Sequence, residues 1–382
     1  MPKPKVLFAA TVSGHIKAFH LPYLQWFQNQ GYETHVAVGD AMDLPYVDVH
    51  HVLPMARSPF SLGNIRAISM LKHMMDKHEY KLVHAHTPMG GVVARLAAAW
   101  STSKSKMVYT AHGFHFYQGA PLKNWLVYFP IEYVLAGLTD VLLTINREDY
   151  QLAKRASFPA RRRMYVPGVG IDLGKYTMVS ADQKKALRQE YGLADRDVVY
   201  ISVAELNANK NQQLVLRAFA RMRAGKGAQK NTTLLCVGTG SLQAEYVALA
   251  NELGISDAVR FLGHRDDVAQ LLQLSDVFVT ASLREGLPVS VMEALATGLP
   301  VVASSIRGQV DLIQHDVNGL LVPFGKAEVR RFAAAMQAVA TWPQERPRLE
   351  ETCRASLKPF SSQVVAKRMQ HIYRHLLCSD AR

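Results

Sequence analysis

The sequence predicts an α/β protein built from two domains, and three observations lead to this prediction. The chain has 382 residues, which exceeds the size at which a single hydrophobic core usually stops growing. Apolar residues make up 49% of it and charged residues 20%, a balance typical of a globular protein that can bury two cores. Continuous apolar runs bounded by turn residues alternate with longer helical patterns, which indicates βαβ units and parallel sheets.

Six apolar runs in the first half predict strands, and most are separated by enough chain for a crossover helix. They cover residues 5–10, 33–38, 82–85, 107–111, 141–145 and 164–167.

The segment 125–145 is also notably apolar. Pro130, Glu132, Gly137 and Asp140 interrupt it, which disfavours a helix that spans a membrane. We expect a buried helix followed by a strand there, and the alternative is a surface that contacts a membrane.

A second series of strands follows residues 168–184, which are rich in Gly and turn formers and predict a linker. Its runs cover residues 198–203, 233–237, 259–261, 277–280, 300–303 and 319–322. Residues 362–377 form one further amphipathic helical pattern. We therefore expect two Rossmann-like domains, 1–175 and 176–358, and a C-terminal helix within 359–382 that crosses back to pack on the first domain.

The three cysteines, Cys236, Cys353 and Cys378, lack the spacing of a zinc site or a disulfide framework. The first apolar run is too short for a signal peptide or a membrane span. Both observations favour a cytoplasmic protein.

The formal net charge of +13 favours an anionic partner. Nucleic acid, a phosphate-bearing substrate and the inner face of a membrane are the three classes of partner considered. No motif that reads nucleic acid accompanies the charge, so nucleic acid is not expected. The densest group of cations, called the basic cluster below, consists of Lys154, Arg155, Arg161, Arg162 and Arg163; an ordinary solvated face is the alternative explanation for it.

The segment 275–304 has the clearest order of elements, namely strand, loop, helix, tight turn and strand. Pro288 suits the first helical position and Gly298 suits the left-handed position after the last turn. These two residues predict a helix over 288–297.

Two carboxylates flank the start of this helix. Glu285 and Gly286 come directly before it, at the carboxyl end of a strand, where open α/β sheets bind ligands and backbone N–H groups favour an anion. Glu293 lies about a turn and a half into the helix and can point back toward the same place. Ionised carboxylates accept hydrogen bonds from hydroxyl pairs, so this arrangement suits a nucleotide sugar. Two surface glutamates that cap a helix are the alternative.

The chain contains the motif Glu285-Gly286-Leu287-Pro288, and Glu293-Ala294 follows it with seven residues between the two glutamates. This pattern resembles the family 4 glycosyltransferases of the GT-B fold. Further matches to that family surround it over residues 237–321. They are Val237-Gly238-Thr239-Gly240, Phe261-Leu262-Gly263, Leu274-Ser275-Asp276-Val277, Gly298-Leu299-Pro300-Val301 and Asn318-Gly319-Leu320-Leu321. The fold implied has two Rossmann-like domains that face each other across a crevice.

The resemblance also implies roles for residues of the second domain. Glu293 would hold the ribose of the donor, Glu285 would contact the transferred sugar, and Lys210 would balance the diphosphate charge. The family usually has an arginine where this chain has Glu205, which we expect to orient Lys210 or to bind an acceptor. The remaining positions assigned to donor binding are Gly286, Leu287, Pro288, Gly263 and Arg307, the last as a second cation.

The first domain resembles the subgroup of that family that builds bacterial surface polysaccharides. The matching segments are Gly14-His15-Ile16-Lys17-Ala18-Phe19-His20, His84-Ala85-His86-Thr87-Pro88, His112-Gly113-Phe114-His115 and Gly168-Val169-Gly170-Ile171-Asp172. The resemblance implies that His112 contacts the transferred sugar and that Gly14 approaches the donor closely. It places His15, His84, His86 and His115 on the acceptor side.

These histidines have two other interpretations. His84 and His86 share a face of a strand and with His112 suggest a metal site, but no cysteine or carboxylate trio supports one, so no metal is expected. The other alternative is that His112 is a structural histidine.

The function implied is retaining transfer of a sugar from a nucleotide diphosphate carrier, with uridine favoured as the base, without metal or other cofactor. The acceptor expected is a growing surface polysaccharide or a lipid diphosphate-linked saccharide, at an anionic membrane surface on the cytoplasmic side. A nucleotide-sugar epimerase and a non-enzymatic sugar-nucleotide-binding protein are the alternatives.

Overall fold

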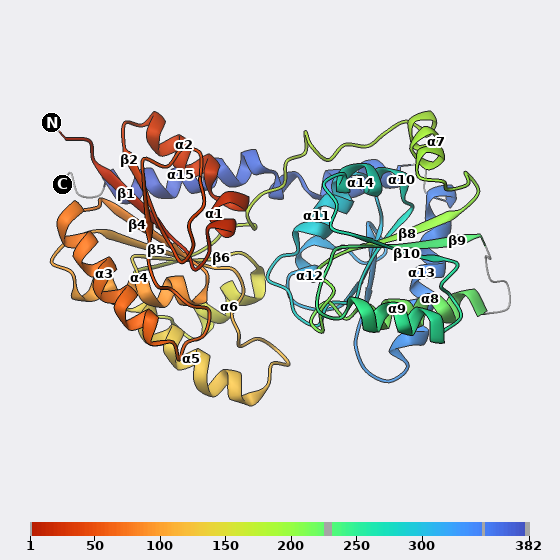
Figure 1. Ribbon diagram of the computed structural model, residues 1–382, viewed down its shortest axis with the longest axis horizontal. Coiled ribbons are helices and arrows are strands. Elements are labelled where there is room, and N and C mark those ends of the chain that lie inside the picture. The colour runs from red at the N-terminus through yellow and green to blue at the C-terminus, as the bar shows by residue number, and fades with distance from the viewer. Residues whose placement is uncertain (1, 225–230, 346–347, 379–382) are drawn as a thin grey trace. The chain divides into compact units, whose positions relative to one another are not determined.

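The computed structural model describes residues 2–224, 231–345 and 348–378. The chain forms two compact units, one of Met1–Gly170 with Gln363–Arg382 and one of Ile171–Ser362. Each has a parallel sheet with helices on both sides (Figure 1). The α/β class and the two Rossmann-like halves are confirmed.

Unit 1 contains a sheet of seven parallel strands in the order β3-β2-β1-β4-β5-β6-β7. The strands are β1 (Lys5–Ala9), β2 (Glu33–Val38), β3 (Val49–Val52), β4 (Leu82–His86), β5 (Lys106–Ala111), β6 (Val141–Thr144) and β7 (Arg162–Tyr165). The helices are α1 (Ser13–Phe19), α2 (Leu21–Asn29), α3 (Leu62–His78), α4 (Pro88–Trp100), α5 (Leu122–Ala136), α6 (Arg147–Arg155) and α15 (Ser362–Cys378). The strand order reverses between β1 and β4, the position at which such sheets bind ligands.

Two strands of unit 1 differ from the prediction by more than one residue at an end. The sequence did not predict β3 because two histidines interrupt its apolar pattern. Its four residues are Val49-His50-His51-Val52. β7 covers Arg162–Tyr165 rather than 164–167, because basic residues continue the strand backward along the edge of the sheet.

Unit 2 contains a six-stranded parallel sheet in the order β10-β9-β8-β11-β12-β13. The strands are β8 (Val198–Val203), β9 (Thr232–Val237), β10 (Val259–Gly263), β11 (Val277–Thr280), β12 (Val301–Ser304) and β13 (Gly319–Val322). The helices are α7 (Ala181–Glu190), α8 (Gln212–Ala224), α9 (Gln243–Glu252), α10 (Val268–Leu274), α11 (Val289–Ala296), α12 (Gln309–Leu312), α13 (Glu328–Glu345), α14 (Leu349–Ser356) and the 3₁₀ turn η1 (Lys358–Phe360).

Two helix starts in unit 2 correct the predictions. The last part of the expected linker 168–184 is helical, because Ser180 and Gln183 form a reciprocal capping box that starts α7. Pro288 is the N-cap of α11, with an extended backbone, and not its first helical residue.

The C-terminal helix α15 belongs to unit 1. Its apolar side packs into the core of that unit, where the Tyr373 hydroxyl hydrogen bonds to Nδ1 of His84 at 2.8 Å. The chain passes between units after Gly170 and after Ser362, whereas the boundaries predicted were 175 and 358.

The predicted buried helix within 125–145 is α5, and only one side of it is buried. Glu132, on the inner side, forms an ion pair of 2.9 Å with the fully buried Arg95 of α4. Trp125, Tyr128 and Phe129 pack against the core. An apolar strip on the other side is exposed; this α5 outer face consists of Leu122, Leu126, Val127, Ile131 and Val134. No helix within the described ranges is long and apolar enough to cross a membrane.

Candidate active site

An ion pair joins two residues predicted to act in catalysis. Glu285 lies in the loop between β11 and α11, and its Oε1 is 2.6 Å from Nζ of Lys210, in the loop between β8 and α8. The Lys210 side chain is 25% exposed and that of Glu285 11%. A cation and a carboxylate are therefore held together at the carboxyl ends of two adjacent strands, still open to solvent.

Backbone contacts between these two loops fix that pair. The Leu283 N–H donates to the carbonyl of Asn209 at 2.8 Å, and Asn209 Nδ2 donates to the carbonyl of Arg284 at 3.0 Å. The Lys210 N–H donates to Asn207 Oδ1 at 3.0 Å. The Asn-rich segment before Lys210 thus positions the lysine and the glutamate as a unit.

Glycines let further loops approach the site. Gly308 has φ +80°, and a Cβ at this position would lie 2.3 Å from the carbonyl oxygen of Gly286, so only glycine fits. The neighbouring Arg307 is buried and its Nε donates to the carbonyl of Glu285 at 3.0 Å. Arg307, the predicted second cation, thus lies beside the site and supports the backbone of the loop that contains Glu285. Leu287 is buried next to these residues.

The Val237–Gly240 segment packs closely on the loop after β8 because its glycines have no side chain. A Cβ on Gly238 would lie 2.1 Å from the carbonyl oxygen of Ala204, and one on Gly240 would lie 2.2 Å from that of Leu206. The Gly238 N–H donates to the carbonyl of Gly263 at 2.7 Å. Gly263 is thereby located at the same edge of the sheet, at the end of β10.

Glu293 faces a residue that the sequence analysis missed. Its Oε1 accepts a hydrogen bond of 2.6 Å from the hydroxyl of Tyr176. Burial raises the pKa of Glu293, while the hydrogen bond from Tyr176 and the charge of Lys175 oppose that rise. In the free protein the Glu293 carboxylate thus accepts a hydrogen bond from a hydroxyl, which is the kind of bond expected from a ribose hydroxyl. Tyr176 gave no signal in the sequence because it lies within the stretch predicted to be a linker.

The expected contact between Glu205 and Lys210 is absent from the described part of the chain. Glu205 is exposed, and the lysine ammonium bonds to Glu285 instead. The prediction that Glu205 orients Lys210 was therefore wrong, because the ammonium turns toward the more buried carboxylate.

Four histidines of unit 1 bring their ring nitrogens within 4.8 Å of one another: His15, His20, His86 and His112. His15 Nε2 is 3.2 Å from His112 Nε2, which is 3.5 Å from His86 Nδ1. The rings of His20 and His86 stack with centroids 3.6 Å apart. Burial lowers the pKa of all four, that of His15 to about 4, so the imidazoles are neutral at pH 7.

His84 and His115 lie differently from the others. Both ring nitrogens of His84 have protein partners, Tyr373 and the Thr110 hydroxyl, each at 2.8 Å. His84 is 1% exposed and lines a cavity of unit 1 together with His86 and His112, so its acceptor contact stays a prediction. His115 packs its ring on Tyr128 of α5, with centroids 4.7 Å apart.

A cavity in unit 1 lies where the histidines meet. Its walls include His20, His86, His112, Gly168 and Val169, so the tract that starts at Gly168 lies against the cluster. His20 is the member to which the sequence analysis gave no role, although it closes the motif that starts at Gly14. Gly14 itself has open space around its Cα, with nothing within 4 Å of a Cβ built there.

Residues 5–146 match the family described as "Glycosyl transferase 4-like", and residues 183–355 match "Glycosyl transferases group 1". The protein named "Putative glycosyltransferase EpsD" of Bacillus subtilis (strain 168) is 39% identical over 379 residues, which are 99% of this chain and 98% of EpsD. The chain is a member of the glycosyltransferases. This membership favours transfer over the epimerase and the non-enzymatic alternatives.

Two further likenesses place the glycosyltransferase among its relatives. The Escherichia coli UDP-Gal:alpha-D-GlcNAc-diphosphoundecaprenol alpha-1,3-galactosyltransferase is 27% identical over 270 residues, 70% of this chain and 69% of the relative. The crystal structure of Anabaena HepE in complex with UDP superposes with a TM-score of 0.76 at 20% identity, over 97% of this chain and 100% of that one. The structural likeness confirms the GT-B class of fold.

Proposed function

We propose that this glycosyltransferase moves a sugar from a UDP-linked donor to a lipid diphosphate-linked saccharide or a growing surface polysaccharide, with retention and without a metal. The Lys210–Glu285 ion pair carries the proposal, because it holds a cation and a hydroxyl acceptor beside the start of α11. The relatives named for sugar transfer to a diphosphate-linked lipid and for a complex with UDP support this choice of substrates.

In the proposed mechanism, donor binding separates the ion pair. Lys210 exchanges Glu285 for the donor diphosphate, and Glu285 then accepts hydrogen bonds from the transferred sugar. The bond from the anomeric carbon to the phosphate oxygen breaks as the acceptor oxygen bonds to the same face of that carbon. The acceptor proton passes to the departing phosphate oxygen. Lys210 and the N–H groups at the start of α11 stabilise the charge that develops on the diphosphate.

His112 is proposed to contact the transferred sugar, with His15 and His86 around it on the acceptor side. Neutral imidazoles suit this role because each can donate one hydrogen bond and accept another from sugar hydroxyls. His86 Nε2 and both nitrogens of His20 are buried with no hydrogen-bond partner among the described residues, so hydrogen-bonding capacity is left there for a ligand.

Glu293→Ala is expected to weaken donor binding strongly, by roughly 2 to 4 kcal/mol, because a half-buried carboxylate that accepts from ribose hydroxyls is lost. Titration calorimetry with UDP measures the change directly. Tyr176→Phe is the matched control, since it removes only the hydroxyl that bonds to Glu293 in the free protein. Unchanged UDP affinity in Glu293→Ala would refute the assignment of this residue to the ribose.

Chelation by EDTA is expected to leave the transfer rate unaltered. The nitrogens of His15, His20, His86 and His112 are close enough together to hold a cation, so this expectation is a specific test of their role. Loss of transfer in EDTA and recovery with manganese or magnesium would contradict it and assign a metal to that cluster.

The acceptor is proposed to lie at the cytoplasmic face of an anionic membrane, which the α5 outer face contacts. Leu126 is 69% exposed and Val134 67%. The only acid in α5 is Glu132, which is paired with Arg95 on the inner side. Trp125, Tyr128 and Phe129 of the same helix are partly buried and pack against the core, so the proposed contact is assigned to the outer residues.

The segment that carries the basic cluster packs beside α5. The ring of Phe158 packs on Phe129 and Tyr133 of α5, with centroids 5.6 and 5.5 Å apart. Along the chain, Phe158 lies between the first two and the last three residues of the basic cluster. Arg161 is joined to the end of α5 through its N–H, which donates to the carbonyl of Thr139 at 3.1 Å. An apolar strip with a basic segment beside its helix matches an anionic bilayer, where each cation near the surface contributes about 1 kcal/mol.

Co-sedimentation with anionic vesicles tests this contact. Wild type is expected to bind at low salt, and Leu126→Asp with Val134→Asp to bind more than about tenfold more weakly, because two apolar side chains are lost from the bilayer surface. Val247→Asp, at an exposed apolar position of α9 in unit 2, is the control. No binding of wild type to any vesicle, with full activity on a water-soluble acceptor, would refute the membrane proposal. A dimer abolished by the double variant would instead assign the face to a second copy of the chain.

A further inference from the structure

A second group of histidines lies in unit 1, among residues that the proposed reaction does not use. His35 is in β2, His51 is in the edge strand β3, and His78 is the last residue of α3. One ring nitrogen from each lies within 4.8 Å of the others. Three chain segments therefore converge on one point at the edge of the sheet.

The distances suit ligands that share one ion. His35 Nδ1 is 3.1 Å from His51 Nε2 and 2.8 Å from the Tyr80 hydroxyl. Ligands that bind a tetrahedral zinc at about 2.0 to 2.1 Å lie about 3.3 Å apart. The ring of His78 lies beside both histidines, with centroids 4.9 Å from His35 and 5.8 Å from His51. Small movements bring three imidazoles to bonding distance of a common centre.

A carboxylate orients the central histidine. His35 Nε2 is 2.7 Å from Glu33 Oε1. A carboxylate accepts a hydrogen bond from Nε2, which leaves Nδ1 on the side that faces His51. Histidines that bind metals usually donate their other N–H to a carboxylate in this way.

The site is both anchored and accessible. His35 is fully buried and held from its far side by Glu33, whereas His51 and His78 are half-buried, which leaves an entry path from solvent.

We propose that His35, His51 and His78 bind one divalent transition-metal ion of the zinc, cobalt or nickel class, with Tyr80 or water completing the shell. Three imidazoles favour these ions over magnesium or calcium, which prefer oxygen ligands. Because β3 and the end of α3 contribute separate ligands, the ion links the edge strand to the helix and stabilises unit 1. The inference does not depend on the proposed function.

Cobalt(II) titration of the full chain, free of any affinity tag, tests the site through the visible absorption of the bound ion. Wild type is expected to take up cobalt at this site and to lose the signal when zinc is added. His51→Ala and His78→Ala should each abolish that signal, with His51→Gln as a second variant should the alanine variant not fold. Glu33→Gln keeps all three ligands and should weaken binding about 10- to 100-fold.

Two histidine controls make the result specific. His73→Ala removes an exposed histidine from the same helix and should retain the signal, as should His112→Ala in the other cluster. Zinc should also raise the unfolding temperature of wild type but not of His51→Ala, since an ion that binds only the folded state stabilises it. Absence of a cobalt signal in wild type, or its loss in His112→Ala but not in His51→Ala and His78→Ala, would overturn the proposal.

Discussion

Lys210→Ala is expected to slow sugar transfer by about 10² to 10⁴-fold, the scale on which the loss of one preorganised charge stabiliser acts. Lys210 is held by the loop around Asn207 and Asn209 and points at Glu285. Without it, the charge that develops on the departing diphosphate has no cation from this loop to stabilise it. The effect should fall on kcat more than on the KM for the donor, because the charge grows in the transition state.

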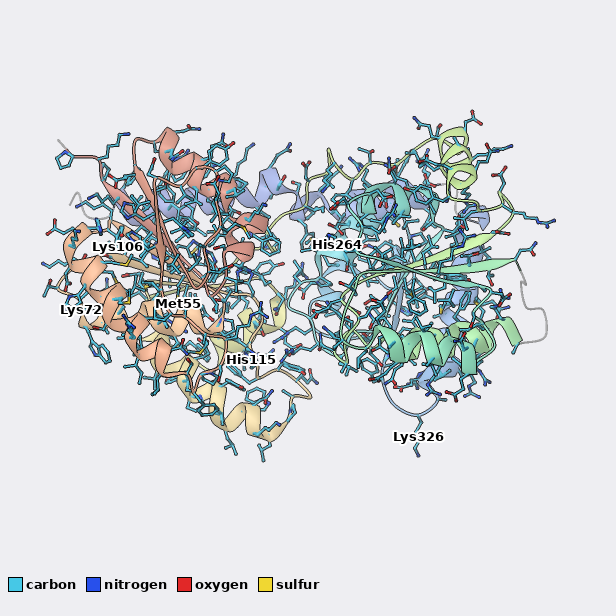
Figure 2. All side chains as sticks on the ribbon, in the orientation of Figure 1. Met55, Lys72, Lys106, His115, His264 and Lys326 are labelled. Carbon is cyan, nitrogen blue, oxygen red and sulfur yellow. The ribbon has the colours of Figure 1, made fainter. Side chains whose placement is uncertain are left out.

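Steady-state rates with a radiolabelled donor measure this loss. Lys326→Ala is the matched control, since Lys326 is an exposed lysine of the same unit, before α13 (Figure 2). Transfer within a few-fold of wild type in Lys210→Ala, with the fold intact by circular dichroism, would move the role of this lysine to another cation.

Glu132→Ala is expected to destabilise unit 1 by about 3 to 5 kcal/mol, because it leaves the buried guanidinium of Arg95 without its counter-charge. Arg95 is fully buried, bonds to Glu132 at 2.9 Å and lies over the ring of Tyr109 at 3.9 Å. The Tyr109 hydroxyl donates to the other oxygen of Glu132 at 3.2 Å. One substitution therefore removes both bonds that α5 makes to this network.

Urea unfolding, followed by tryptophan fluorescence, measures the change. Lys123→Ala, at an exposed position of the same helix, is the control and should be nearly neutral. Replacing Arg95 and Glu132 together by Met and Leu should recover much of the loss, since apolar substitution of both partners avoids an unpaired buried charge. An unfolding curve of Glu132→Ala that matches wild type would refute this account of the pair.

The sequence predicted most of the fold because the buried strands of parallel sheets are continuous apolar runs. β2, β8, β11 and β13 have the predicted bounds. β3 escaped prediction because it is an edge strand with two histidines. The start of α7 was missed because a capping box, and not periodicity, marks it.

The sequence predicted only those parts of the donor site that lie close together along the chain. Glu285, Gly286 and Glu293 belong to one strand-loop-helix segment, so their common position was predictable. The pairing of Lys210 with Glu285, and of Tyr176 with Glu293, joins segments far apart along the chain. The sequence carries no local signal for such contacts, just as it gave none that His84 is held by Tyr373 of α15.

The central claim is that the chain transfers sugar from a nucleotide diphosphate donor with retention. The most direct test is proton NMR of the full chain incubated with a panel of UDP-sugars and an extract of lipid diphosphate-linked saccharides. The account predicts one UDP released for each new glycosidic bond, with the anomeric configuration of the donor kept in the product. A product of inverted configuration, or a donor isomerised without release of UDP, would contradict it.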